Sequence, residues 1–322
     1  MHHPLINRLA RLILDGSLLT AKQGRALAAL GQEHTTELLM AANVVKKRFG
    51  LKGFTCSILN AKSGTCSQDC RFCAQSGHYA TGAPTHSLLP LEDLIRRGLD
   101  MHHAGATCYS LVTSGLMLGS EEIDRICRCV EHLRERTSLT LSASLGLLTP
   151  DYARRLVDAG LTRYHHNLET ARSHFPLICT THDYDEDIAT IRLAGEHGLQ
   201  ICCGGILGLG ESFEQRIELA ETLAELQVDT VPLNFLVPIP GTPLEKSELL
   251  SPHDALKSVA LFRLMLPTTN ITIAGGREQI LGDYQSWLPL AGANGMMIGN
   301  YLTTMGRDLG KDQRMVEDGQ WI

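Results

Sequence analysis

Short apolar segments alternate with longer amphipathic segments over most of the chain. The apolar segments have the length and β-branched content of strands, and they are Phe54–Leu59, Thr107–Thr113, Leu139–Ser144, Thr162–Asn167, Gln200–Leu207, Thr230–Leu236, Asn270–Ala274 and Gly295–Ile298. The amphipathic segments repeat apolar residues at every third or fourth position, as helices do, and they are Leu91–Ala104, Glu121–Arg136, Pro150–Ala159, Asp185–His197, Phe213–Leu226 and Pro252–Leu266. This alternation predicts a parallel sheet with helices packed on it.

Eight such strands fit a closed (β/α)8 barrel of the TIM type, which is the α/β architecture we predict. An open doubly wound sheet is the alternative, because periodicity does not show whether the first and last strands pair. Before the first strand, Leu9, Leu27 and other apolar residues recur at helical spacing, and Thr20 is placed to cap a helix. We therefore predict an N-terminal helical extension over 1–48, a barrel over 49–304, and a polar tail over 305–322 that covers the surface or is partly mobile.

Composition and charge narrow the class of partners. The chain has 322 residues, 43% hydrophobic and 20% charged, which is an ordinary globular composition with enough length for a sizeable core. A formal net charge of -6 gives no reason to expect a nucleic-acid or anionic-membrane partner. No apolar run resembles a signal peptide or a membrane-spanning helix, so we expect a cytoplasmic protein.

Ten cysteines point to metal or redox chemistry, because a cytoplasmic chain of this size is not expected to have a disulfide framework. Cys66, Cys70 and Cys73 follow the first predicted strand in a C-x3-C-x2-C spacing. Three thiolates this close can hold three corners of a four-iron four-sulfur cube and leave one iron open to a small molecule. In a barrel, this loop lies at the carboxyl mouth, where active sites occur.

A zinc site and a ferredoxin-type cluster are the alternatives for this loop. Structural zinc usually has paired C-x2-C knuckles or a closing Cys or His pair. A bacterial ferredoxin run has a fourth cysteine followed by proline, where this chain has Ala74 and Gln75. The missing fourth cysteine favours the open-iron cluster.

The third predicted strand has an unusual polar stripe. Thr140, Ser142 and Ser144 alternate with apolar neighbours and therefore share one face. Because barrels usually fill their interior with branched apolar side chains, a polar interior predicts a cavity that holds a ligand. A stripe satisfied by buried water is the alternative.

The cysteine spacing, with Phe72 before the last cysteine, resembles the signature of the radical S-adenosylmethionine enzymes. Longer blocks resemble the biotin synthases, and they are Asn60–Cys66, Cys73–Tyr79, Asn167–Thr170, Gly204–Glu211, Val231–Val237 and Gly276–Gln279. The resemblance implies that a 4Fe-4S cluster cleaves S-adenosylmethionine and that the 5'-deoxyadenosyl radical abstracts hydrogen from dethiobiotin. It implies that sulfide from an auxiliary iron-sulfur cluster then traps the carbon radical, and that a second cycle closes the ring of biotin.

The resemblance also implies the residues that bind the cofactor. Phe72 is expected against the adenine, and Asn167 and Glu169 are expected on the ribose hydroxyls. Gly204 and Ile206, in the Gly-rich motif of the fifth strand, are expected to approach the adenine.

Substrate residues follow from the same resemblance. Asn234, which we place among the catalytic residues, matches the asparagine that binds the ureido ring of dethiobiotin, and Asn167 offers a second amide. Where some biotin synthases have an arginine for the cofactor carboxylate, this chain has Asp187, so another group must make that contact.

The auxiliary cluster of the biotin synthases is held by cysteines on three strands and by an arginine. Cys108, Cys202 and Arg277 match three of these positions, and Arg277 is also expected to be catalytic. Ser142 stands at the remaining cysteine position, and a hydroxyl is a much poorer ligand than a thiolate. We predict that Cys56 on the first strand takes its place. A thiolate moved across the barrel favours a four-iron auxiliary cluster, with the usual two-iron cluster (2Fe-2S) as the alternative.

Other functions stay open at this point. The chain could be a related radical enzyme acting on another small molecule, as in hydrogenase-cluster maturation, or an iron-sulfur electron carrier without catalysis. The resemblance further implies a reduced flavodoxin- or ferredoxin-type electron donor and a homodimer. Cys179 and Cys203 have no assigned role.

Overall fold

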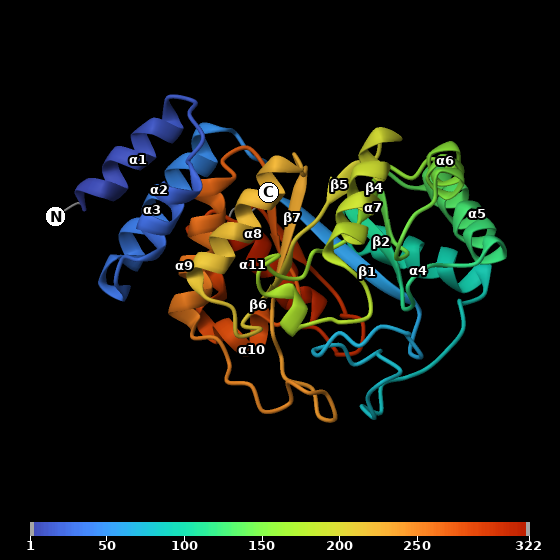
Figure 1. Ribbon diagram of the computed structural model, residues 1–322. Helices are drawn as coiled ribbons and strands as arrows, with labels where there is room; N and C mark the ends of the chain where they lie inside the picture. The colour runs from blue at the N-terminus through green and yellow to red at the C-terminus, as the bar shows by residue number, and fades with distance from the viewer. Residues whose placement is uncertain (1–2, 320–322) are drawn as a thin grey trace.

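The predicted strands form one closed parallel barrel in the computed structural model, which describes residues 3–319 (Figure 1). In order round the barrel the strands are β1 (Phe54–Lys62), β2 (Cys108–Thr113), β3 (Thr140–Ser144), β4 (Arg163–His165), β5 (Gln200–Cys202) with β6 (Gly205–Leu207), β7 (Thr230–Phe235), β8 (Asn270–Ile273) and β9 (Gly295–Met297). The strand β9 pairs with β1, and β5 pairs with both β4 and β7. The barrel is therefore confirmed, and the open sheet is wrong.

The fifth predicted strand is divided into β5 and β6. Cys202 of β5 pairs with Thr230 of β7, and β6 pairs with β7 again from Gly205 onward. A Cβ atom on Gly204, in the gap, would lie 2.0 Å from the carbonyl oxygen of Pro232. Only glycine therefore lets the two backbones approach this closely.

Helices cover the outside of the barrel as the pattern predicted. They are α4 (Leu91–His103), α5 (Ser120–Arg136), α6 (Pro150–Ala159), α7 (Tyr184–Glu196), α8 (Phe213–Glu225) and α9 (Pro252–Met265). Across residues 3–319, the structure has no helix of the length and apolarity that a bilayer crossing requires.

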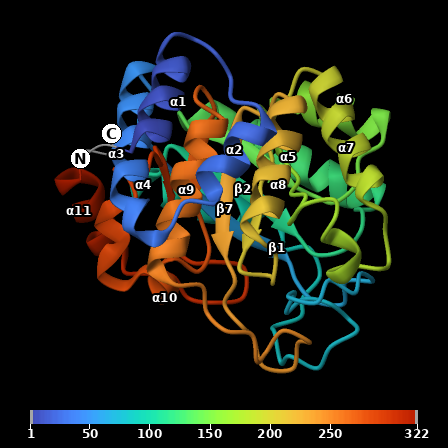
Figure 2. The same cartoon turned by 60° about the vertical axis from the view of Figure 1, so that its left-hand side comes forward.

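The N-terminal extension is helical and lies against one side of the barrel (Figures 1 and 2). It consists of α1 (Pro4–Leu14), α2 (Ala21–Ala28), the 3-10 turn η1 (Gln32–His34) and α3 (Thr35–Arg48). The hydroxyl of Thr20 accepts a hydrogen bond from the backbone N–H of Gln23, as expected for a helix cap. The helix α3 packs along α9, which explains why every residue of α9 from Ala255 to Met265 is buried.

The polar tail contains a helix that is attached to the barrel by a buried ion pair. After the short elements α10 (Arg277–Leu281) and η3 (Gly282–Trp287) and the strand β9, the chain forms α11 (Leu309–Asp318). Asp312 of α11 is fully buried, and its carboxylate accepts a hydrogen bond of 2.7 Å from Arg277. The polar composition of the tail did not predict this attachment.

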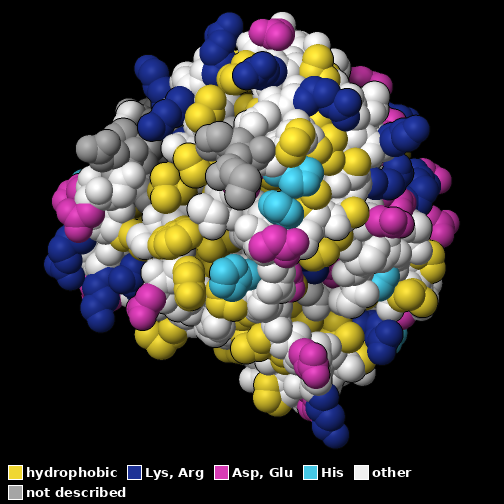
Figure 3. Space-filling model, turned by 90° about the vertical axis from the view of Figure 1, so that its left-hand side faces the viewer, with side chains coloured by type: hydrophobic (Ala, Val, Ile, Leu, Met, Phe, Trp, Pro, Cys, Tyr) yellow, Lys and Arg dark blue, Asp and Glu magenta, His cyan; other side chains and the backbone are white. Residues whose placement is uncertain are grey.

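The surface near the N-terminal helices has mixed charge. Figure 3 shows basic, acidic and apolar side chains interspersed on this face. Charges of both signs are thus interleaved on this face.

Candidate active site

The barrel interior is hollow and holds a cavity of about 270 Å³, here called the barrel cavity. On β1, the residues that face the helices are buried, whereas the inward-facing Cys56, Ile58 and Asn60 are only partly buried. Cys56 and Ile58 line the barrel cavity, as does Ser142 of the predicted polar stripe. The polar interior therefore does border a cavity of ligand size.

A second cavity of about 240 Å³, here called the loop cavity, lies under the cysteine loop, and Cys66, Cys70 and Cys73 all line it. Across residues 3–319, no three His, Cys, Asp or Glu side chains converge tightly enough to hold a single metal ion. Thiols spread around a space suit a cube of iron and sulfide better than one tetrahedral zinc ion. The donor set therefore fits the cluster that the spacing predicted.

Backbone hydrogen bonds fold the cysteine loop back on itself. The N–H of Cys66 donates to the carbonyl of Gln75 at 3.0 Å, and the N–H of Gly77 donates to the carbonyl of Cys66 at 2.7 Å. Thr65, just before the first cysteine, has a φ of 50°, which a threonine rarely adopts. These contacts hold the first and last parts of the loop together around the loop cavity.

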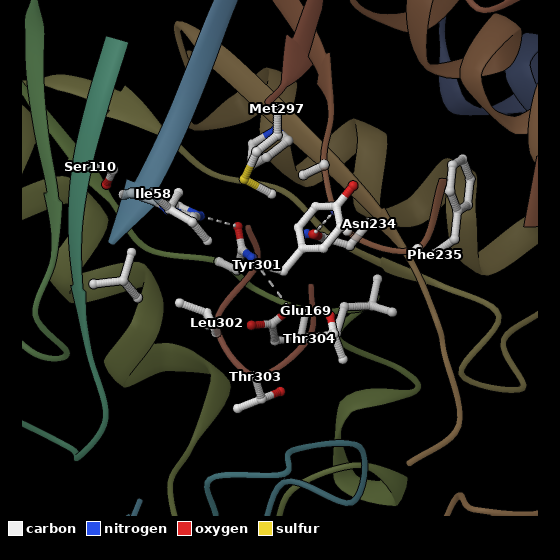
Figure 4. A pocket seen from close by; sticks show the side chains of 18 of the residues that line it. Ile58, Ser110, Glu169, Asn234, Phe235, Met297, Tyr301, Leu302, Thr303 and Thr304 are labelled. Atoms are coloured by element: carbon white, nitrogen blue, oxygen red, sulfur yellow. Dashed lines mark hydrogen bonds between the residues drawn. The ribbon is translucent and has the colours of Figure 1, made fainter. Parts of the chain in front are cut away.

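The two cavities share a wall. Phe72, Cys73, Asn167 and Glu169 line both of them. Phe72 also packs on a small buried apolar cluster that includes Leu236, as does Ile206. The expected cofactor residues are thus brought together between the cysteine loop and the barrel interior, and Figure 4 shows Glu169 on this wall.

Glu169 has an unusual backbone and an unusual environment. Its φ of 61° is in the left-handed region, and such strain often occurs at functional sites. Burial, followed by the nearby charge of Asp187, raises the pKa of its carboxyl to about 8. Asn167 donates to the Glu169 carboxylate at 3.4 Å and accepts from the backbone N–H of Gly204 at 3.1 Å. Gly204 therefore positions Asn167 from outside the cavities, which it does not line.

Asn234, on β7, projects into the barrel cavity (Figure 4). Its amide oxygen accepts from the backbone N–H of Gly275 at 2.9 Å, and its amide nitrogen donates to the carbonyl of Gly205 at 3.4 Å. These bonds fix the orientation of the amide. Since an amide group has two acceptor sites and two donor hydrogens, it retains one of each for a ligand.

Asp187 is fully engaged with two histidines at the wall of the loop cavity. It lies 2.8 Å from the Nε2 atom of His166 and 3.3 Å from the Nε2 atom of His182. The hydrogen bond to Asp187 raises the pKa of His182 to about 10. Asp187 therefore maintains a positive charge on His182, which lines the loop cavity.

The structure locates the two unassigned cysteines. The sulfur of Cys179 lies 3.8 Å from the sulfur of Cys70 and 3.2 Å from the Nδ1 atom of His182. Cys203 points away from both cavities and is fully buried in the core between the barrel and its helices.

Cys56 lies beside Cys108 in the barrel cavity. The two residues are partners in the pairing of β1 with β2, and their sulfur atoms are 2.8 Å apart as free thiols. The hydrogen bond to Cys108 and burial raise the pKa of Cys56 well above its usual value. Cys202 lines the same cavity from β5. The structure thus brings the three predicted auxiliary thiols to one cavity.

Arg277 is not in this cavity, which corrects the expectation from its sequence motif. Its guanidinium is fully buried and donates to the carboxylate of Asp312, to the side chain of Gln285 and to the carbonyl of Met297. The physical reason is that Arg277 begins α10, beyond the end of β8, and the tail helix supplies its counter-charge.

Arg163 is the guanidinium that lies at these thiols, although no sequence motif pointed to it. It lines the barrel cavity from β4, and its Nη1 atom is 3.7 Å from the sulfur of Cys108. A usable signal was present, because Arg163 has the same strand parity as Asn167, which was expected to face inward.

Comparisons with known families match almost the whole chain. Residues 61–223 match the radical SAM superfamily, and residues 232–321 match the biotin and thiamin synthesis associated domain. Biotin synthase from Geobacter metallireducens is 51% identical over 97% of this chain and 96% of its own length. Biotin synthase from Geotalea daltonii is 50% identical over the same shares. Biotin synthase from Nitratidesulfovibrio vulgaris (strain DP4) is 51% identical over 92% of this chain and 83% of its own length.

Solved structures of other enzymes share the fold. A methylornithine synthase has a TM-score of 0.81 and 21% identity, and the match covers 97% of this chain and 96% of the other. A maturase of the [FeFe]-hydrogenase has a TM-score of 0.83 and 15% identity, and the match covers 98% of this chain and 74% of the other. At these identities the likeness supports the barrel and not a shared reaction.

Proposed function

The chain belongs to the biotin synthase family, and on that basis we propose that its two cavities carry out sulfur insertion into dethiobiotin. One observation carries the proposal: the barrel cavity is lined by Cys73 of the cysteine loop and by the thiols of Cys56, Cys108 and Cys202. A substrate in this cavity therefore has the radical loop on one side and the sulfur-donor site on the other.

At the loop cavity, Cys66, Cys70 and Cys73 hold the 4Fe-4S cluster, which when bound supplies the reductive cleavage of S-adenosylmethionine. Phe72 supports the adenine, with Ile206 packed on the same apolar cluster.

Asn167 and Glu169 bind the ribose of the cofactor. An ionised Glu169 accepts hydrogen bonds from the hydroxyl groups, and Asn167 is held in place by the backbone of Gly204. His182 provides the positive charge for the cofactor carboxylate, in the role of the arginine that other members have at the position of Asp187.

Asn234 holds the ureido ring of dethiobiotin, with Asn167 as the second amide. Apolar side chains such as Ile58, Val112 and Met297 line much of the remaining barrel cavity and suit the methylene carbons of the substrate. This arrangement orients the reacting carbon atoms toward the cofactor on one side and the thiols on the other.

In the barrel cavity, on the side away from the cysteine loop, Cys56, Cys108 and Cys202 hold the auxiliary cluster, which when bound supplies the sulfur atom. Cys56 takes the role of the cysteine that is missing at Ser142, and its 2.8 Å approach to Cys108 supports this exchange. We retain the four-iron form as the preferred auxiliary cluster.

A reduced flavodoxin- or ferredoxin-type protein is proposed as electron donor, and the protein is proposed to be a cytoplasmic homodimer. These proposals follow from the family. Turnover that depends on the added donor protein tests the electron donor, and light scattering tests the homodimer.

The reaction is tested by anaerobic incubation of the reconstituted protein with S-adenosylmethionine, a reductant and dethiobiotin. We expect both 5'-deoxyadenosine and biotin, measured by mass spectrometry, with deoxyadenosine formation stimulated by dethiobiotin. An electron carrier makes no deoxyadenosine, and an enzyme with another substrate makes it without dependence on dethiobiotin. Either result contradicts the proposed reaction.

The role of Cys56 is tested in a protein that lacks the radical cluster, with Cys66, Cys70 and Cys73 all changed to alanine. Iron content and the electron paramagnetic resonance spectrum then report only the auxiliary site. Cys56→Ser should reduce the iron content and change the spectrum, whereas Ser142→Ala should leave both unchanged.

Cys127→Ser is the matched control, because this cysteine is half-buried on α5 outside the barrel. It should keep the iron content of its parent. The proposal that Cys56 replaces the cysteine missing at position 142 is wrong if the Cys56→Ser protein retains full iron. It is also wrong if the Ser142→Ala protein loses iron.

A further inference from the structure

Several buried polar atoms in the barrel cavity have no partner. Within residues 3–319, these include the Nε atom of Arg163, the hydroxyl of Ser110 and the hydroxyl of Thr272, and all three residues line the barrel cavity. Buried hydrogen-bond donors normally have acceptors. The two hydroxyls can donate or accept, whereas the guanidinium nitrogen can only donate, so the three unpaired groups together indicate a ligand with acceptor atoms in this cavity.

Arg163 is the only cation among these three residues, and its position is set by the sheet. It pairs with Ser142 on β3 and with Gln200 on β5, at the start of β4. Its Nη2 atom donates to the side chain of Gln200 at 3.2 Å, and its Nη1 atom lies 3.7 Å from the sulfur of Cys108. One edge of the guanidinium is thus anchored, and the other faces the thiols.

Ser142 makes this approach possible. It lies between Ser110 and Arg163 in the register of β2, β3 and β4. A short side chain here leaves space through which Arg163 extends across β3 toward Cys108, which begins β2. The same residue that removes a thiol from β3 therefore admits a guanidinium from β4.

No carboxylate within residues 3–319 forms an ion pair with Arg163 within 4.0 Å. A largely buried guanidinium needs a counter-charge, because an isolated charge is costly to bury. Asp229 acts on this charge from beyond ion-pair distance, whereas the described residues nearest to the guanidinium include the thiol of Cys108, so the thiolates and sulfide of a cluster held by Cys56, Cys108 and Cys202 would supply the direct counter-charge.

We propose that Arg163 contacts the auxiliary cluster directly, as the fourth protein group of that site beside Cys56, Cys108 and Cys202. Arg277 has no part in the site and instead anchors the tail helix through Asp312. The inference rests on the proposed function, because it presumes that an auxiliary cluster occupies the barrel cavity.

The test uses the protein in which the three cysteines of the radical loop are alanine, so that only auxiliary iron is present. Arg163→Met removes the charge, and Arg163→Lys keeps the charge but removes the planar fork. Both variants should lose at least half of the auxiliary iron and sulfide, or retain the iron with a changed Mössbauer and paramagnetic resonance spectrum. Circular dichroism checks that each variant is folded.

Two controls separate cluster contact from indirect effects. Gln200→Ala removes the bond that anchors the far edge of the guanidinium but keeps its charge and the thiols, so it should retain the iron content of its parent and disturb the spectrum less than either Arg163 variant. Arg277→Lys changes the arginine that the sequence motif suggested and should leave the spectrum unchanged. Parent iron content and spectrum in both Arg163 variants, or a changed spectrum in the folded Arg277→Lys protein, overturns the inference.

The outcomes also separate this inference from the proposed function. If the protein without radical-loop cysteines holds no iron after reconstitution, the auxiliary site and the role of Arg163 both fail. If it holds iron that neither Arg163 variant disturbs, the role of Arg163 fails alone and the proposed reaction stands.

Discussion

Replacing Glu169 with glutamine should stabilise the fold and weaken cofactor binding at the same time. Burial raises the pKa of this carboxyl to about 8, whereas an unfolded chain has its ordinary value of 4.5. Between these values the folded protein binds more protons than the unfolded protein, so the free energy of unfolding falls as pH rises. Glutamine has a similar shape and does not ionise. The free energy of unfolding of the variant therefore does not fall with pH through this residue.

The expected difference can be estimated from the shift. At pH 7 only the part of the shift between the unfolded value of 4.5 and pH 7 counts, which corresponds to about 3 kcal/mol because each pKa unit is worth about 1.4 kcal/mol. The side chain borders a cavity large enough for water, which screens the charge, so we expect roughly 2 kcal/mol. The advantage of Glu169→Gln should be below about 1 kcal/mol at pH 5, reach roughly 2 kcal/mol near pH 7 and still rise toward pH 8.

Cofactor affinity should change in the opposite direction. A hydrogen bond to a charged acceptor contributes about 1.5–3 kcal/mol, so the variant should bind S-adenosylmethionine roughly tenfold to a hundredfold more weakly. For the parent, affinity should rise with pH as Glu169 ionises through about 8, whereas the variant should lack this rise. Anaerobic equilibrium dialysis on the reconstituted protein measures both.

Urea denaturation of the cluster-free proteins from pH 5 to pH 8 measures the stability difference. Glu122→Gln is the control of opposite sign: although partial burial acts against it, the ion pair with Lys62 at 2.8 Å lowers the pKa of Glu122. That variant should be no more stable than the parent at pH 7. A constant difference between parent and Glu169→Gln over the whole pH range, or a less stable variant at pH 8, refutes the reasoning.

Three further predictions concern the loop, the substrate and the tail. Cys70→Ala should lower 5'-deoxyadenosine formation at least a hundredfold with unchanged circular dichroism, and the parent rate would remove the loop assignment. Asn234→Ala loses hydrogen bonds worth about 1–2 kcal/mol, so biotin formation should fall roughly tenfold and more than uncoupled deoxyadenosine formation; equal losses contradict its substrate role. Asp312→Asn breaks a buried ion pair with Arg277, which costs about 3–5 kcal/mol, so limited proteolysis should release the tail much faster than in the parent; equal cleavage rates contradict this attachment.

The sequence by itself determined the strands, the helices and the cysteine loop. Alternation of apolar residues is a local signal, so the segment from Pro150 to Ala159 was predicted with the bounds that α6 has. The spacing of Cys66, Cys70 and Cys73 is equally local, because a short loop must bring residues a few positions apart to one cavity. The placement of Cys56 was different, because the sequence does not show which parity of the first strand faces inward; the structure shows that Cys56 and Ile58 line the barrel cavity.

Only the tertiary structure decided which arginine lies beside Cys108 in the barrel cavity. The motif around Arg277 indicates its place after β8, but not the direction of its side chain, which is set by the distant Asp312 on α11. The approach of Arg163 to Cys108 depends on the register of three neighbouring strands and on the short side chain of Ser142 between them. Register and counter-charge come from residues far apart in the chain, so local patterns do not contain them.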